Sequence, residues 1–371
     1  MVKKHFGRQH LAIILLLISV HLHTFGQDYN PLFLIKQNGL FGYIQKSGEI
    51  AIEPIYSAAF EFNEGIAFVV KDNKPFFIDK EGIKQFDIPS DLVVTPICSE
   101  GMIAFNSPEG YGFLNNKGEI AIPPAYLEAE TFSDNLALVR DVSTNKYGYI
   151  NKKGQYKIAP QFDRANSFAD ALALVKKNND LFYINTAGKI SILPNSQFAY
   201  SFSEGVALIW RNFFFEYIDK EGDVIARIWA PQKQELYKDL NWAMCSDGLI
   251  AVYDNAKDKI GFVNKNLKKE EKENLAKFQP GQGKEVIAPS FQNVNFFTNG
   301  MARLWSGNKV GFINKKGETT IRCQFDDAKP FNNNLARVFV GGAELDFKNN
   351  DPEAKMGYIN KSGEWIWEPS N

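Results

Sequence analysis

The sequence predicts an all-β protein made of about nine tandem copies of a three-stranded β-meander. A short strand of the form aromatic or apolar, glycine, aromatic, apolar recurs along the chain, with spacings of 34, 36, 36, 34, 34, 45, 50 and 46 residues. Such a near-constant period is typical of a repeat architecture. A period of 34–36 residues is short for a four-stranded propeller blade. The sequence therefore favours an elongated or superhelical β-solenoid, with a closed propeller-like toroid as the alternative.

The clearest copy, Tyr147 to Val175, shows why each strand is expected. Its first strand, Tyr147–Ile150, alternates large and small residues, and Gly148 lets a neighbouring backbone approach closely. The turn Asn151–Gly154 follows, with asparagine first and glycine fourth, as in a type I turn closed by a residue with positive φ. Across the nine copies this turn has Asp or Asn first in eight and Gly fourth in eight, which indicates one structure repeated throughout.

The second half of the same copy predicts two more strands with a loop between them. Residues 156–160 form the second strand, which ends at Pro160 because proline cannot donate to a β-ladder. The loop after it carries Phe162 and Phe168, which we expect to fill the space between neighbouring units. Residues 172–175 form the third strand. A meander of this size cannot bury its apolar face alone, so stacking of neighbouring units must supply the core.

Residues 1–26 have the pattern of a secretory signal peptide. Lys3, Lys4 and Arg8 precede the apolar stretch 11–20, and small residues end the segment at Thr24-Phe25-Gly26. Ten apolar residues are short for a span of the bilayer. We therefore expect cleavage and a mature repeat domain, 27–371, that is secreted or lies in the periplasm or cell envelope, with no transmembrane span.

Charge and histidine content exclude several classes of function. Loss of the three basic residues of the signal changes the formal net charge from −1 to −4, which leaves no basic stripe suited to nucleic acid. All four histidines lie within residues 1–26, so the mature chain has neither a Ser-His-Asp triad nor a histidine metal ligand. The glycines follow the repeat period and form no phosphate-binding loop. We predict no catalytic residue, no metal and no cofactor.

The three cysteines are not a disulfide framework. Cys98 and Cys245 occupy the same position of the repeat, where another copy has phenylalanine, and are interpreted as small core residues. Cys323 stands where another copy has proline, and a free thiol in a loop is expected.

The longer late spacings arise from three predicted insertions, at 227–241, 267–285 and 340–355. Insertions in repeat proteins lie in loops and often mark a binding face. The alternative, which we favour, is that exposed loops simply tolerate extra residues.

An acidic residue recurs just before the third strand of six copies, and later copies have asparagine there. Stacking would align these residues into a row able to bind cations, although Asp, Glu or Asn before Gly is also ordinary turn chemistry, the interpretation we favour. Two carboxylates of the row could act as a glycosidase pair, but a catalytic pair should interrupt the repeat. The row consists of Glu64, Glu100, Asp134, Asp170, Glu204 and Asp247.

The repeat is similar to that of the WG-repeat family of bacterial proteins. The shared pattern is an apolar residue and glycine, then Phe or Tyr, Ile or Val, Asp or Asn, and glycine three residues later, followed by Ile-x-Pro-x-Phe or Tyr. It is best matched at 41–70, 111–140, 147–175, 310–338 and 356–369. No Trp-Gly dipeptide occurs: an aromatic or aliphatic residue or methionine precedes the glycine instead. The resemblance implies a β-repeat scaffold that presents an interaction surface, and no catalytic residues.

Three functions are compatible with this sequence. The first is a non-enzymatic exported scaffold that binds a protein of the envelope or the extracellular space. The second is a module that binds a cell-wall or envelope glycan through exposed aromatic residues, for which the candidates are Trp210, Trp229, Trp242 and Trp305. A glycan-active enzyme built on the acidic row is the least favoured. Trp365 and Trp367, in the last copy, are expected to cover an exposed core edge.

Overall fold

The computed structural model describes residues 30–229, 245–254, 257–266, 286–345, 351 and 353–370, and these residues form an almost entirely β structure. The predicted signal peptide and the 267–285 insertion lie outside the described residues, as do most of the 227–241 insertion and part of the 340–355 insertion. Residues 227–229 of the first insertion are instead the end of a strand. No helix among the described residues is long and apolar enough to cross a membrane.

All strand pairs are antiparallel, and the strands follow one another as a meander. The first sheet contains β1 (Phe33–Gln37), β2 (Leu40–Ile44) and β3 (Ile50–Tyr56), and the second contains β4 (Ala58–Ala59), β5 (Ile66–Lys71), β6 (Lys74–Asp79) and β7 (Lys84–Asp87). A seven-stranded sheet follows, with β8 (Val93–Val94), β9 (Met102–Ser107), β10 (Gly110–Asn115), β11 (Ile120–Ala129), β12 (Ala137–Asp141), β13 (Tyr147–Ile150) and β14 (Tyr156–Phe162).

The remaining sheets have three or four strands each. Two of them are formed by β15 (Arg164–Ala165), β16 (Leu172–Lys177), β17 (Asp180–Asn185) and β18 (Ile190–Ile192), and by β19 (Phe198–Ala199), β20 (Ala207–Arg211), β21 (Phe214–Ile218) and β22 (Val224–Trp229). The next has β23 (Leu249–Asp254), β24 (Lys259–Asn264) and β25 (Ile287–Phe291). The last two contain β26 (Val294–Thr298), β27 (Met301–Ser306), β28 (Lys309–Asn314) and β29 (Thr319–Phe325), and β30 (Asp327–Ala328), β31 (Leu335–Val340), β32 (Lys355–Asn360) and β33 (Trp365–Ser370).

Each repeat unit is centred on a hairpin between a third strand and the first strand of the next sequence copy. We number the units 1 to 9 by these hairpins: β1–β2, β5–β6, β9–β10, β12–β13, β16–β17, β20–β21, β23–β24, β27–β28 and β31–β32. Units 3 and 4 share the long strand β11, which pairs with β10 and with β12. One sequence copy therefore contributes to two neighbouring sheets.

The prediction of three strands per unit missed a short fourth strand. In most units part of the expected loop pairs with the third strand, and we call this two- to five-residue segment the inner strand. In unit 5, for example, the Asp163 amide donates to the Lys176 carbonyl at 2.8 Å and the Asn166 amide to the Leu174 carbonyl at 2.9 Å. Most inner strands are only two residues long, which is too short for an alternation of apolar and polar residues, so periodicity cannot reveal them.

The glycine of the first strand is required by the close approach that the sequence indicated. A Cβ on Gly148 would lie 2.8 Å from both the Ile158 carbonyl oxygen and the Pro160 nitrogen of the second strand. The register of β13 and β14 shifts between Tyr147 and Tyr149, across this glycine, so the strand with Pro160 bulges opposite it. A side chain at position 148 would force these two backbones apart.

Aromatic side chains form the core between units, as expected for Phe162 and Phe168. Tyr149 packs against Phe168 with ring centroids 4.7 Å apart, and its hydroxyl donates to the Asn166 carbonyl at 2.7 Å. Phe162 meets Phe182 of the next unit edge-on. The contact of Tyr149 with Phe168 recurs in other units as Tyr43–Phe62, Phe113–Phe132, Tyr183–Phe202, Phe262–Phe297 and Phe312–Phe331.

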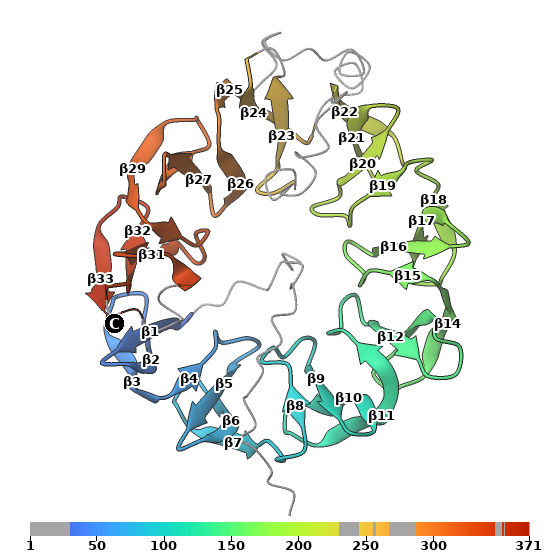
Figure 1. Cartoon of the computed structure of the whole chain (residues 1–371), viewed down its shortest axis with the longest axis horizontal. Coiled ribbons are helices and arrows are strands. Elements are labelled where there is room, and N and C mark those ends of the chain that lie inside the picture. Colours follow the sequence, from blue (N-terminus) through green and yellow to red (C-terminus); the bar gives the residue numbers. More distant parts are fainter. Residues whose placement is uncertain are drawn as a thin grey trace, which may run out of the picture.

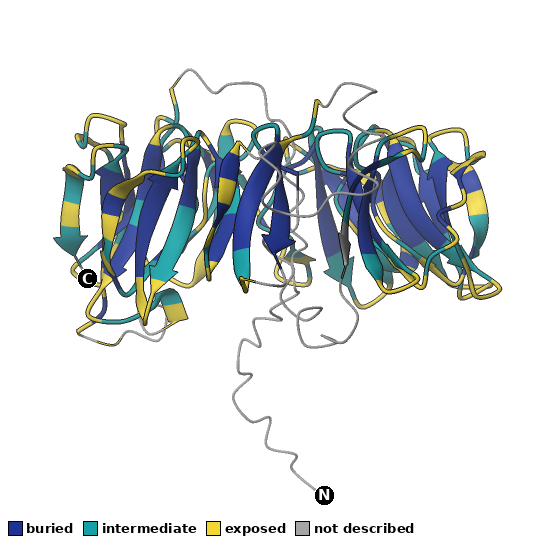
Figure 2. Ribbon diagram, turned by 90° about the horizontal axis from the view of Figure 1, so that it is seen from above, coloured by how far each residue is buried: buried dark blue, intermediate teal, exposed yellow. Residues whose placement is uncertain are grey.

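The sheets follow one another around a central opening, with the inner strands facing the centre and the second strands on the outside of the ring (Figure 1). Seen from the side, the units form a disc about one strand length thick (Figure 2). Units 9 and 1 lie next to each other, and we call their contact the seam. There Phe33 packs on Tyr358 with centroids 5.5 Å apart, and Trp367 borders the same buried cluster, at the core edge as expected. Trp365 is 40% exposed and instead lies against Phe325 of unit 8.

Candidate functional site

The acidic row lies in tight turns at one edge of the units. All six acidic residues, and Asn299 and Asn333 at the same position, have positive φ angles between 49° and 56°. Left-handed backbone is unusual for residues other than glycine and is best tolerated by Asn and Asp. The turn interpretation is therefore correct for the whole row, including its glutamates.

The row has a second role that the sequence did not indicate: each side chain binds the turn of the next unit. Glu64 accepts from the backbone amides of Glu100 and Gly101, both at 2.7 Å. We call this series of side-chain-to-amide bonds between units the ladder. Its further acceptor–donor pairs are Glu100 with Asn135, Asp134 with Ala171, Asp170 with Gly205, Glu204 with Asp247 and Gly248, Asp247 with Gly300, and Asn299 with Asn334.

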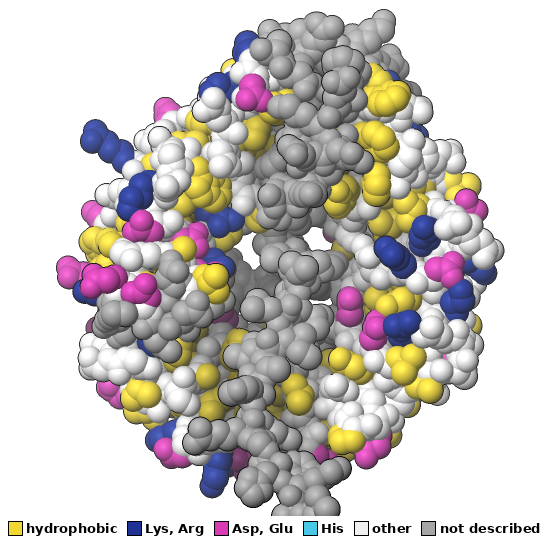
Figure 3. Space-filling model, viewed as in Figure 1, with side chains coloured by type: hydrophobic (Ala, Val, Ile, Leu, Met, Phe, Trp, Pro, Cys, Tyr) yellow, Lys and Arg dark blue, Asp and Glu magenta, His cyan; other side chains and the backbone are white. Residues whose placement is uncertain are grey.

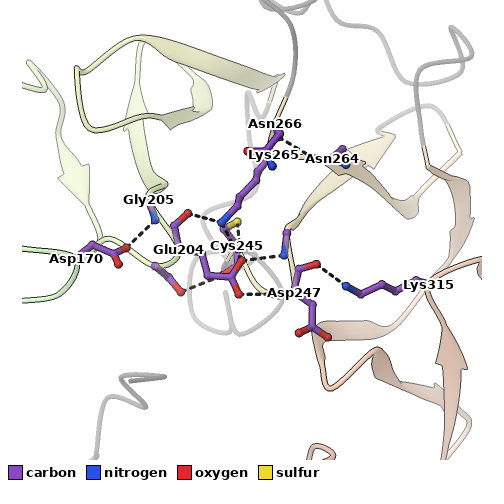
Figure 4. Close-up of polar contacts among 11 residues, drawn as sticks. Asp170, Glu204, Gly205, Cys245, Asp247, Asn264, Lys265, Asn266 and Lys315 are labelled. Atoms are coloured by element: carbon purple, nitrogen blue, oxygen red, sulfur yellow. Dashed lines mark hydrogen bonds and ion pairs between the residues drawn. The ribbon is translucent and has the colours of Figure 1, made fainter. Parts of the chain in front are cut away.

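Lysines of the turn after the first strand add to the ladder. Lys265 donates to the Glu204 carbonyl at 2.7 Å and to its carboxylate at 3.1 Å, and Lys315 donates to the Asp247 carbonyl at 2.6 Å (Figure 4). Lys152 makes an ion pair with Glu100 at 3.3 Å. In each case a lysine of one unit contacts the acidic residue of the unit before it, so the row is neutralised in part from within the protein.

Electrostatics around Glu204 show that its carboxylate is used structurally. Burial raises the pKa of Glu204, but the Gly248 and Asp247 amides and Lys265 outweigh that effect and hold the pKa below its usual value. A carboxylate stabilised in this way is a poor general acid and has little capacity left for a metal ion. Among the described residues there is no group of three or more His, Cys, Asp or Glu side chains able to hold a metal.

Two cysteines pack beside the ladder. Cys98 and Cys245 are buried and free, and burial, reinforced by the Glu64 or Glu204 carboxylate, raises the pKa of each thiol to about 12. Such thiols are protonated and unreactive at neutral pH. Their interpretation as small core residues is confirmed. Cys323 is free but half-buried, and it lies in strand β29 rather than in a loop.

The four candidate tryptophans do not form one described surface. Trp210 and Trp305 occupy the same position of the third strand in units 6 and 8, and both are half-buried at the edge of the core. Phe198 lies against Trp210, and the Arg303 guanidinium lies over the Trp305 ring. Trp229 ends β22, with its side chain outside the described part of the molecule, and Trp242 lies wholly outside it.

Unit 6 departs from the repeat at Glu216, which stands where most first strands have glycine. This carboxylate is 1% exposed and forms ion pairs with Arg211 and, at 2.5 Å, with Arg227. The second strand β22 pairs directly opposite Glu216 without the bulge, so room exists there for a side chain. Two features of the sequence indicated this difference: the first strand lacks its glycine, and the second strand lacks the proline that follows at a fixed distance in most other units.

Sequence reasoning also missed a set of positions that differs from unit to unit. The first residue of the short inner strand and the third-strand residue opposite it form what we call the rim pair, at the border of the central opening. The pairs are Ala58–Val70, Val93–Asn106, Glu128–Arg140, Arg164–Lys176, Phe198–Trp210, Val294–Leu304 and Asp327–Phe339, with Glu128 taking this place within β11. Aligning the copies on their third strands would have revealed this variation.

Solved structures with a similar fold share very little sequence identity with this chain. The fold resembles a eukaryotic initiation factor, with a TM-score of 0.55 and 9% identity over 92% of this chain and 98% of that one. Two weaker likenesses are the dihydro-heme d1 dehydrogenase NirN, at 0.43 and 12% over 94% and 75%, and apo AztD from Citrobacter koseri, at 0.35 and 12% over 82% and 97%. The structural neighbours have β-propeller-like folds.

The comparison with curated proteins gives no match. A family model described as "WG containing repeat" matches six segments, at residues 41–74, 111–141, 147–179, 182–209, 281–308 and 311–342. These segments include the turns of the ladder in Glu64, Asp134, Asp170 and Asn333 and several of the glycines that the bulge requires. With half of its length matched, this chain belongs to the WG containing repeat family.

Proposed function

We propose that the protein is a non-enzymatic exported scaffold that binds other proteins at the cell envelope or outside the cell. The observation that supports it best is that some repeat positions are constant and structural, whereas others vary between units. The recurring polar residues are occupied by the ladder, whereas the rim pairs vary in charge and apolar character without disturbing it. A constant frame with varied positions on one border is the arrangement that repeat proteins use for binding surfaces.

We further propose that the scaffold is a closed ring rather than an open solenoid. The support is the seam, where side chains of unit 9 take the place of an inner strand on β1. Tyr358 donates to the Leu34 carbonyl at 2.8 Å and Ser370 to the Lys36 carbonyl at 2.6 Å. In unit 2 the corresponding carbonyls, of Phe68 and Val70, accept from the amides of Phe60 and Ser57, which flank the inner strand β4.

A pull-down with residues 27–371 tests the scaffold role, with detergent-solubilised envelope proteins and envelope polysaccharide as separate baits. A saturable protein partner, lost on deletion of 267–285 or 340–355 or on substitution at the rim pairs, supports it. Retention on polysaccharide that weakens when Trp210 and Trp305 are replaced favours the glycan module instead. Binding to neither contradicts both functions.

A cysteine pair across the seam tests the ring. Cysteines placed in units 1 and 9 at positions facing each other across β1 and β32 should form an intramolecular disulfide in the monomer under mild oxidation, after Cys98, Cys245 and Cys323 are replaced by serine or alanine. An open solenoid would give only slow, concentration-dependent intermolecular cross-links.

A further inference from the structure

We infer that the rim pairs of units 5 and 6 form a docking site for an extended peptide segment that carries acidic and aromatic residues. The inference rests on the proposed scaffold function and names the chemistry of the partner. The site consists of Arg164, Lys176, Phe198 and Trp210.

The cationic half is an unusual pair of like charges. Arg164 and Lys176 lie directly opposite each other on β15 and β16. Cross-strand partners have Cβ atoms about 5 Å apart, and like charges in this position destabilise a sheet. Unit 4 shows the neutral solution at the same place, where Glu128 pairs with Arg140 at 2.7 Å. Unit 5 keeps two cations where one carboxylate would remove the repulsion.

The neighbouring carboxylate relieves this repulsion only in part. Asp163 attracts Lys176 electrostatically, but its two oxygens are already bound by Lys146 and by the Asn178 amide. Lys177 faces the other side of the sheet, where its ammonium donates to Gln161 at 2.9 Å. An incoming carboxylate is the group that would relieve the repulsion, because charge-assisted hydrogen bonds to Arg and Lys are the strong ones.

The apolar half lies in the next unit at the same position. The Phe198 side chain is 60% exposed, and its ring tilts against Trp210 at a centroid distance of 5.9 Å. Figure 3 shows basic, acidic and hydrophobic side chains over this part of the ring. Trp210 borders the core between units 6 and 7, whereas Leu174, on the same face of β16 as Lys176, belongs to the core between units 5 and 6, so the aromatic pair lies one unit further along than the cationic pair. An exposed aromatic in the unit that follows a cationic pair fits a ligand with an anionic and an apolar group in sequence.

A peptide fits these features better than a polysaccharide does. Trp210 is half-buried, and the rings of Phe198 and Trp210 meet at 49°, so they present no flat platform on which a sugar face could stack. An acidic side chain and an aromatic one, spaced along an extended chain so that they reach two successive units, match the rim pairs of units 5 and 6 instead.

Panning a random peptide library on the 27–371 chain tests the inference, followed by affinity measurements with the synthetic peptides selected. Selected peptides should be enriched in Asp or Glu and in Phe, Tyr or Trp. Arg164→Glu recreates the arrangement of unit 4, so it should preserve the fold and weaken binding by about tenfold or more, as should Phe198→Ser. Lys153→Glu and Ile190→Ser, at exposed positions away from the rim pairs, are the matched controls and should change affinity by less than about twofold.

Several outcomes would overturn the inference. One is a selection that yields no binders or no enrichment of acidic residues. Another is binding that the controls weaken as much as the site variants do. Binding of polygalacturonate that Arg164→Glu abolishes, without any selected peptide, would assign the surface to an anionic glycan instead. If the envelope partner of the pull-down binds Arg164→Glu and Phe198→Ser normally, the scaffold function stands and this site does not.

Discussion

The seam and an interface inside the array solve the same packing problem with different groups. Between units 4 and 5, Tyr149 packs on Phe168, which comes from the loop before a third strand, and its hydroxyl binds a loop carbonyl. At the seam, Tyr358 makes the same two contacts with Phe33 and the Leu34 carbonyl, both in the third strand β1 itself. The aromatic contact is therefore the same at both interfaces, whereas the backbone carbonyl that accepts the tyrosine hydroxyl comes from a loop in one and from a strand in the other.

A second difference is that the seam uses side chains from more distant units. Arg337 of unit 9 pairs with Glu61, a residue of the loop that leads into unit 2, and its guanidinium also lies over the Tyr358 ring. Internal interfaces rely instead on the ladder, with one acidic or amide side chain per unit. Strength inside the array thus comes from repetition, while strength at the seam depends on a few individual residues.

The largest effects should come from removing the aromatic contact on either side of this comparison. Phe168→Ala should lower the free energy of unfolding by about 3–5 kcal/mol, because it leaves a cavity in a fully buried core. Phe33→Ala should open the seam at a comparable cost. Chemical denaturation measures the first, and limited proteolysis near residue 33 distinguishes the second. If Phe33→Ala lowers the global stability as much as Phe168→Ala does, but does not increase proteolysis near residue 33, the seam does not open independently of the rest of the ring.

Breaking one step of the ladder should have an intermediate effect that depends on pH. Glu204→Gln removes the ion pair with Lys265 and weakens two amide bonds, which should cost about 1.5–3 kcal/mol at neutral pH. The folded-state pKa of Glu204 is lowered, so its contribution is complete above the ordinary value of 4.5 and is lost as pH falls through the lowered pKa.

The wild-type chain should therefore lose more stability than Glu204→Gln between pH 5 and acid conditions, and the two curves should converge there. Urea midpoints over this range measure the difference. Asn299, which has a neutral side chain at the same position, supplies the internal control: the difference in stability between Asn299→Ala and the wild type should not change with pH. Parallel curves for Glu204→Gln and the wild type would contradict the ladder as the origin.

The smallest effects should come from single hydroxyl groups. Tyr149→Phe removes one hydrogen bond to a backbone carbonyl and keeps the ring, so it should cost about 1 kcal/mol. Tyr358→Phe also removes the bond that the hydroxyl accepts from Arg337 at 2.9 Å, and Ser370→Ala the bond that it accepts from Trp367 at 3.0 Å, so each should cost about 1–2 kcal/mol at the seam. Hydrogen exchange of the amides in β1 should accelerate in Tyr358→Phe and Ser370→Ala but not in Tyr149→Phe. Acceleration in all three would mean that the seam has no local stability of its own.

Sequence reasoning identified the strands of the repeat because their glycines and turn residues have local causes. It was wrong to end the second strand at Pro160, because β14 continues through this proline to Phe162. The requirement for Gly148 opposite Pro160, and the positive φ of the acidic turns, both follow from short-range chemistry that any one copy displays. The inner strands could not be predicted, because most are two residues long and their pairing depends on the neighbouring third strand. The ladder was equally hidden: Glu64 and the amide of Gly101 are 37 residues apart, and only stacking brings them together.

The candidate site shows the same limit. The acidic row was found by its regularity, and its structural use explains that regularity. The rim pairs differ between copies and carry no recurring pattern. An alignment of the third strands shows that Lys176 and its counterparts vary, but their partners become evident only once Arg164 is seen opposite Lys176. In a repeat protein, then, sequence periodicity reveals the frame, while the positions that differ must be located on the frame.

The direction of the ladder has a consequence for how the chain is made. Each acceptor side chain precedes its amide donors in the sequence, so a unit that has just been synthesised offers acceptors that the next unit can bind as it emerges from the ribosome. The order of assembly then follows the order of synthesis, one neighbour at a time. Tyr358 and Ser370 belong to unit 9, so the contact with β1 can form only after all the units between them have been synthesised.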